Sequence, residues 1–152
     1  MYRSIVLAYD GSRESQLALR EGAILARRLS ANVHLLSVVN EGAGVMIAES
    51  VYSGPAQAVE QTYRAVLQEG AERLRALGCS CTAELVAGEP PAMIAAYARR
   101  VGADLVVVGH RTRGMMQRWW NGSTGAYLLD HLDCSLLMAR RDMDDADLEA
   151  VF

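Results

Sequence analysis

Val106-Val107-Val108-Gly109 opens the stretch that decides the fold, and Asn121-Gly122-Ser123-Thr124 closes it. The first segment predicts a buried strand that ends at a glycine, and the second predicts the start of a helix. A helix that begins on Gly-Ser-Thr presents unpaired backbone N–H groups and the positive end of its dipole. With the arginines of the intervening loop, these donors predict an anion pocket of the kind that holds nucleotide phosphates. The alternative is that the glycines only turn the chain and Ser123 only caps a helix.

Strand and helix patterns alternate on both sides of this stretch. The expected strands lie at residues 4–9, 33–39, 79–86, 105–108 and 134–139. The expected helices lie at residues 13–29, capped by Ser12, and at 59–77, 90–101 and 123–132. Such an alternation predicts right-handed crossovers and a doubly wound α/β fold, in which helices cover both faces of a five-stranded parallel sheet. Ligands of such sheets sit beyond the carboxyl ends of the strands, where the strand order reverses.

The length and the hydrophobic content predict one compact domain. The chain has 152 residues, of which 51% are hydrophobic, which suffices for one sizeable core. We assign this domain to residues 1–141 and an acidic, mobile tail to residues 142–152. The segment from Asn40 to Pro55 is rich in Gly and Ser, and a connection of this length is typical of a lid or an interface.

Charge and residue usage exclude several classes of function. The net charge of -3 argues against a nucleic-acid partner, which needs a basic face. The chain has no Lys, which excludes a Walker P-loop and Schiff-base chemistry. We find no signal peptide and no apolar run of transmembrane length, so we expect a cytoplasmic protein without a membrane partner. The three Cys residues suit neither a disulfide framework nor a zinc site, and no metal site is expected.

Nearly the whole chain resembles the universal stress protein family, from Ile5-Val6-Leu7-Ala8-Tyr9-Asp10-Gly11-Ser12 to Cys134-Ser135-Leu136-Leu137-Met138-Ala139-Arg140. This resemblance implies the strand order 3-2-1-4-5 and a homodimer formed through the strand Ser135–Ala139. Members that bind adenine nucleotides carry Gly-x2-Gly-x9-Gly-Ser/Thr after the fourth strand. In this chain Gly109 and Gly122 fill the first and third glycine positions, whereas Thr112 replaces the second.

The resemblance also implies a role for each residue of the expected site. Asp10 would accept hydrogen bonds from ribose, while Ala8 and Val38 would contact the base. The phosphates would lie against Gly109, Arg111, Thr112, Gly122, Ser123 and Thr124. The implied cofactor is ATP or AMP, with or without Mg²⁺, and the implied role is that of a stress-response or signalling factor. Asp10 also suits the start of a helix, and Val38 alone suits a strand in the core.

Three functions stay open at this point. Thr112 lacks the freedom of a glycine, so the chain is either a nucleotide binder or an interaction module of the same fold that binds none and has an unknown protein partner. The third function is that of an enzyme related to the adenine nucleotide alpha-hydrolases. No catalytic constellation stands out in the sequence, so we expect binding rather than turnover, with ATP hydrolysis at most weak.

Overall fold

The computed structural model describes residues 1–40, 56–110, 123–140 and 142, without the side chains of residues 56, 57 and 123–125. Its elements are β1 (Ser4–Ala8), α1 (Arg13–Leu29), β2 (Asn32–Val39), α3 (Ala56–Ala76), β3 (Cys81–Ala87), α4 (Pro90–Arg100), β4 (Leu105–Gly109), α5 (Ser123–His131) and β5 (Ser135–Ala139). These elements are the alternating strands and helices that the sequence predicts. The segment 41–55 and the tail residues 143–152 lie outside the described residues.

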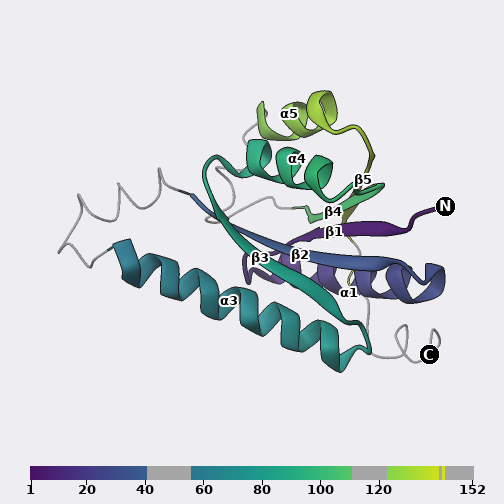
Figure 1. Ribbon diagram of the computed structural model, residues 1–152, viewed down its shortest axis with the longest axis horizontal. Coiled ribbons are helices and arrows are strands. Elements are labelled where there is room, and N and C mark those ends of the chain that lie inside the picture. The colour runs from purple at the N-terminus through teal and green to yellow at the C-terminus, as the bar shows by residue number, and fades with distance from the viewer. Residues whose placement is uncertain (41–55, 111–122, 141, 143–152) are drawn as a thin grey trace.

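All five strands pair in parallel in the order β3-β2-β1-β4-β5, which confirms the predicted strand order. The helices lie in two layers, with α1 and α3 on one face of the sheet and α4 and α5 on the other (Figure 1). The central strands β1 and β4 are buried almost throughout, as expected of strands covered on both faces. The strand order reverses between β1 and β4, so the ligand site that the sequence predicts would lie at their carboxyl ends.

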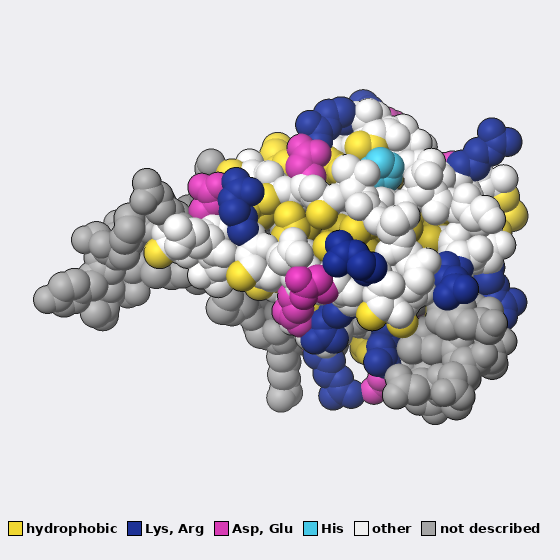
Figure 2. All heavy atoms as spheres, turned by 60° about the horizontal axis from the view of Figure 1, so that its bottom comes forward, with side chains coloured by type: hydrophobic (Ala, Val, Ile, Leu, Met, Phe, Trp, Pro, Cys, Tyr) yellow, Lys and Arg dark blue, Asp and Glu magenta, His cyan; other side chains and the backbone are white. Residues whose placement is uncertain are grey.

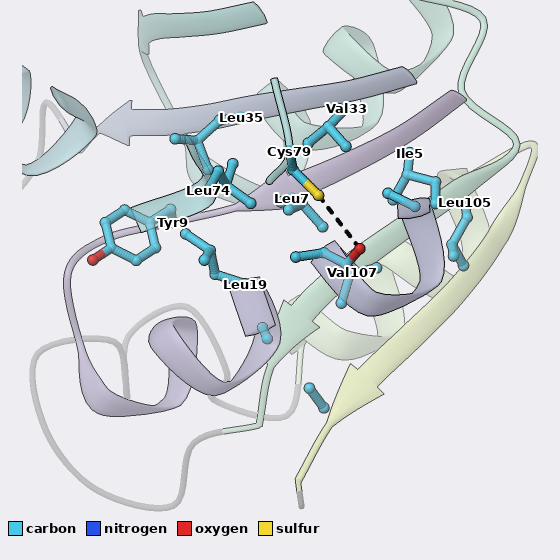
Figure 3. Close-up of a cluster of buried hydrophobic side chains, with 14 of the residues drawn as sticks. Ile5, Leu7, Tyr9, Leu19, Val33, Leu35, Leu74, Cys79, Leu105 and Val107 are labelled. Carbon is cyan, nitrogen blue, oxygen red and sulfur yellow. Dashed lines mark hydrogen bonds between the residues drawn. The ribbon is translucent and has the colours of Figure 1, made fainter. Parts of the chain in front are cut away.

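Two hydrophobic clusters hold the layers together. The first lies between the sheet and the helices α1 and α3, and it includes Leu7, Leu35, Leu74 and Val107 (Figure 3). Leu74 is fully buried, and truncating such a side chain to Ala costs about 2–5 kcal/mol. The second cluster lies between the sheet and the helices α4 and α5, and Val6, Val38, Ile94, Val106 and Leu128 belong to it.

The outer surface of the α1–α3 layer is charged. Arg, Asp and Glu side chains stand among apolar ones on the face seen in Figure 2. Along α3, Arg64 pairs with Glu60 at 2.6 Å and Arg73 pairs with Glu69 at 2.7 Å. Exposed pairs of this spacing contribute only about 0.3–0.5 kcal/mol each. The stability of this layer therefore comes from its apolar inner face.

Some element boundaries differ from the prediction. Two expected strands start later, at Cys81 instead of Cys79 and at Ser135 instead of Cys134. At the first of these boundaries Gly78 has the left-handed φ of 74°, and the Cys79 N–H donates to the carbonyl of Leu74 at 2.9 Å. This bond closes the end of α3, as is usual after a helix-terminating glycine. It engages Cys79, the residue that would otherwise begin the strand.

Candidate functional site

Two strands that are distant in sequence bring the candidate site together. Ala8 ends β1 and Gly109 ends β4, and the two strands are neighbours, with Leu7 opposite Val107. Asp10 follows β1 after one further residue, so it lies at the same edge of the sheet as Gly109. The adjacency that this site requires is therefore present.

The Asp10 carboxylate is held by the turn that leads into α1. Its Oδ1 accepts hydrogen bonds from the backbone N–H of Ser12, at 3.0 Å, and from the Ser12 hydroxyl. The Asp10 backbone N–H lies 3.4 Å from the hydroxyl oxygen of Ser15, which in turn donates to the carbonyl of Ser12 at 2.9 Å. These contacts fix the orientation of the carboxylate and confirm that Asp10 has a structural role at the helix start.

Ser12 is the N-cap of α1, as the sequence predicts. Its hydroxyl oxygen accepts from the backbone N–H of Ser15 at 3.2 Å, and its own backbone is extended. This bond satisfies one of the donors that a helix start leaves unpaired. The cap therefore occupies one of the N–H donors at the start of α1.

Gly109 is a glycine because the strand passes very close to α1. A Cβ at this position would lie 2.5 Å from the carbonyl carbon of Glu14 and 2.8 Å from the backbone nitrogen of Ser15. Both atoms belong to the backbone, so no side-chain rotation could make room. The first glycine of the phosphate motif is thus required by the packing of β4 on the first turn of α1.

Ala8 and Val38 lie in the second hydrophobic cluster. Their side chains are 5% and 1% exposed, respectively. Val38 pairs with Val86 of β3, and Ala8 pairs with Leu36 of β2. The structure therefore supports the alternative that Val38 is a core residue, and it shows that Ala8 is buried in the same cluster. The contact of both residues with a base stays a prediction.

Tyr63 of α3 also lies at this end of the sheet, although the sequence indicates only that it belongs to the expected helix at residues 59–77. Burial and the nearby Asp10 carboxylate raise the pKa of Tyr63, while a hydrogen bond with the backbone of Asn40 lowers it. Asp10 follows β1, and Asn40 follows β2. Tyr63 therefore contacts the backbone after β2 and lies near the carboxylate that follows β1, and only the three-dimensional packing of α3 reveals it.

The remaining predicted site residues belong to the connection between β4 and α5. Arg111, Thr112 and Gly122 lie outside the described residues. Ser123 and Thr124 form the first turn of α5, and their side chains are outside the description. Of the expected phosphate site, the described structure therefore includes Gly109 at its start and the first turn of α5 at its end.

We also searched the described residues for side chains that could bind a metal ion. No group of three or more His, Cys, Asp or Glu in the described part of the chain could hold a metal ion.

Cys79, Cys81 and Cys134 are free thiols, and burial raises the pKa of each of them. A raised pKa reduces the thiolate fraction, which disfavours redox chemistry at these cysteines. Among the helices described, none is long and apolar enough to cross a membrane.

Nearly the whole chain matches one protein family. The family model described as the universal stress protein family matches residues 1–140. The chain therefore belongs to the universal stress protein family. A universal stress protein A-like protein from Arabidopsis thaliana is 27% identical over 116 residues, which cover 72% of this chain and 66% of that relative.

Solved structures of this family share the fold. A universal stress protein in complex with cAMP has a TM-score of 0.67 at 23% identity, and the match covers 91% of this chain and 97% of the other. A universal stress protein family protein from Arabidopsis thaliana with AMP bound has a TM-score of 0.64 at 20% identity, covering 94% of each chain. These neighbours bind adenine nucleotides, while their likeness to this chain is one of fold.

Proposed function

We propose that this chain binds an adenine nucleotide, ATP or AMP, in the crevice at the carboxyl ends of β1 and β4. The observation that carries the proposal is the pairing of these two strands, which places Asp10 and Gly109 at one edge where the strand order reverses. The cAMP and AMP complexes of structures with this fold support the choice of nucleotide. In this proposal the protein acts as a cytoplasmic stress-response or signalling factor.

Each residue of the proposed site has a definite role. Asp10 accepts from the ribose hydroxyls, and the ends of β1 and β2 at Ala8 and Val38 border the base. The backbone N–H groups at the start of α5 hold the phosphates. The residues that complete the phosphate site are Gly109, Arg111, Thr112, Gly122, Ser123 and Thr124, and Mg²⁺ accompanies ATP when it is present.

Calorimetric titration with ATP, AMP and cAMP tests the proposal. The informative variant is Asp10→Asn, because an amide oxygen can still accept from Ser12 while the charge is lost. We expect the affinity for AMP to fall about tenfold or more, as for the loss of a hydrogen bond to a charged group. Asp104→Asn is the matched control, since Asp104 also accepts backbone N–H bonds but lies at the amino end of β4. A folded wild-type protein that gives no heat with millimolar nucleotide would refute the proposal.

The second candidate function is an interaction module that binds no nucleotide. It is favoured by the packing of Gly109, whose glycine is explained by the backbone of α1 without any bound molecule. Under this alternative Thr112 blocks the phosphate site. Thr112→Gly would then create ATP affinity or improve it sharply, whereas it would change little in a chain that already binds ATP.

A homodimer formed through β5 belongs to the same proposal. This strand is at one edge of the sheet, and its residues Leu136, Leu137 and Met138 are half-buried in the single chain. An edge strand is a natural place for a second copy to pair. Sedimentation equilibrium at micromolar concentration should give the mass of a dimer, and the mass of a single chain would contradict this part.

A further inference from the structure

His110 and Arg140 form a contact that the family motif does not include. His110 follows β4 and Arg140 follows β5, and the two strands are paired, with Gly109 opposite Ala139. The backbone N–H of His110 donates to the carbonyl of Ala139 at 3.0 Å. The guanidinium Nη2 of Arg140 lies 2.7 Å from Nε2 of His110. A guanidinium and an imidazole are thus held together at the carboxyl ends of the strands.

This pair belongs to the face of the sheet that α5 covers. Side chains alternate along a strand, and Val106, Val108, Leu136 and Met138 all belong to the second hydrophobic cluster. The same alternation assigns His110 and Arg140 to that face.

The start of α5 is directed toward the same end of the sheet. Only three residues separate His131, the last of α5, from Ser135, the first of β5. The end of α5 is therefore near the amino end of β5, and its beginning lies toward the carboxyl ends of the strands, as the arrangement in Figure 1 indicates. The positive end of the helix dipole and the His110–Arg140 pair thus lie at one end of one face.

The pair lacks an acidic counterpart within the described structure. The nearest carboxylate along the chain, that of Asp142, pairs instead with Arg13 of α1 at 2.7 Å. None of the ion pairs among the described residues includes Arg140. A guanidinium offers donors only, so Nε2 of His110 accepts in this contact while the other N–H groups can still donate. An anion with several oxygens suits such a group of donors.

We propose that Arg140 and His110 form an anion subsite that holds the outermost phosphate of a bound adenine nucleotide and thereby favours ATP over AMP. The proposal rests on the proposed function, because the nucleotide is what places a phosphate chain at the start of α5. In this arrangement the backbone N–H groups at the start of α5 bind the phosphate next to ribose. The guanidinium of Arg140 binds two oxygens of the outermost phosphate of ATP. His110 fixes the guanidinium from the other side.

The test is a titration of the full chain and its Arg140→Gln variant with ATP, AMP and inorganic tripolyphosphate. We expect ATP affinity to fall about tenfold or more, as for the loss of a hydrogen bond to a charged group, while AMP affinity stays within about twofold. Arg140→Lys should restore only part of the ATP affinity, because an ammonium does not reproduce the planar fork. His110→Gln, which leaves the arginine in place, should weaken ATP less than Arg140→Gln does.

Arg99→Gln is the matched control. Arg99 is an exposed arginine of α4 whose guanidinium lies 3.0 Å from the carboxylate of Asp133, away from the carboxyl ends of the strands. This variant should leave the affinities for ATP and AMP unchanged. Thermal unfolding of each variant establishes that it is folded at the temperature of the titration.

The outcomes separate this inference from the proposed function. Equal losses of ATP and AMP affinity in Arg140→Gln, or no loss of either, would overturn the subsite. Tripolyphosphate binding that depends on Arg140, in a chain that binds neither nucleotide, would support the anion subsite and refute the proposed function. A wild-type chain that binds neither nucleotide and no tripolyphosphate would overturn both.

Discussion

Replacing Gly109 with Ala should destabilise the protein strongly, because the new methyl group meets backbone. It would lie 2.5 Å from the carbonyl carbon of Glu14, whereas real Cβ atoms essentially never come closer than 3.0 Å to such a neighbour. Strand β4 and helix α1 must therefore separate by at least about 0.5 Å. Overpacking of this kind costs about 1–3 kcal/mol, and we expect the upper end because no side chain can rotate away.

Urea unfolding followed by circular dichroism measures this loss in the free energy of unfolding. In thermal unfolding, a loss of about 3 kcal/mol corresponds to a decrease in Tm of about 6–12 °C for a chain of this size. Gly102→Ala is the control, since nothing lies within 4 Å of a Cβ there and only its φ of 62° opposes the change. It should cost about 1 kcal/mol. If Gly109→Ala unfolds no more easily than Gly102→Ala, the packing argument is wrong.

Four further predictions follow from single residues. Burial tends to raise the pKa of Asp104, but backbone hydrogen bonds from Arg3 and Ser4 lower it overall. The ionised carboxylate therefore stabilises the protein above about pH 4, and this stabilisation is lost as the pH falls through the pKa of the folded protein. Urea unfolding at several pH values should show that Asp104→Asn loses less free energy of unfolding in acid than the wild type does. Burial lowers the pKa of His34, so stability should fall as the pH drops below about 6.5, and less so in His34→Leu. Tyr63→Phe should lower the free energy of unfolding by about 1 kcal/mol in urea. Mass spectrometry should find no labelling of Cys79, which is buried, by a thiol reagent until the chain unfolds, and rapid labelling of the folded protein would contradict its burial.

The order of the elements could be predicted because each one follows from a local pattern. The run from Val106 to Val108 is apolar without alternation, which is typical of a strand buried on both faces. Ser12 and Gly78 mark a helix start and a helix end through preferences that act over a few residues. The start of β3 could not be predicted in this way, since Cys79 is apolar enough for a strand but its backbone N–H completes the end of α3.

The site was predictable only in part, because its contacts are long-range. The motif identified Gly109, but only the structure relates that glycine to the backbone of Glu14. Tyr63 and Arg140 could not be singled out, since a tyrosine on an amphipathic helix and an arginine after a strand are ordinary features of a sequence. Their partners, the Asn40 backbone and His110, are brought to them by the parallel sheet.

Two-dimensional NMR of the isotopically labelled protein during titration with AMP tests the central claim most directly. The account predicts that shift changes concentrate on the backbone amides of Asp10, Gly109 and Ser123 and saturate with a single affinity. Changes confined to other faces of the sheet, or none at millimolar AMP, would contradict a nucleotide site at the ends of β1 and β4.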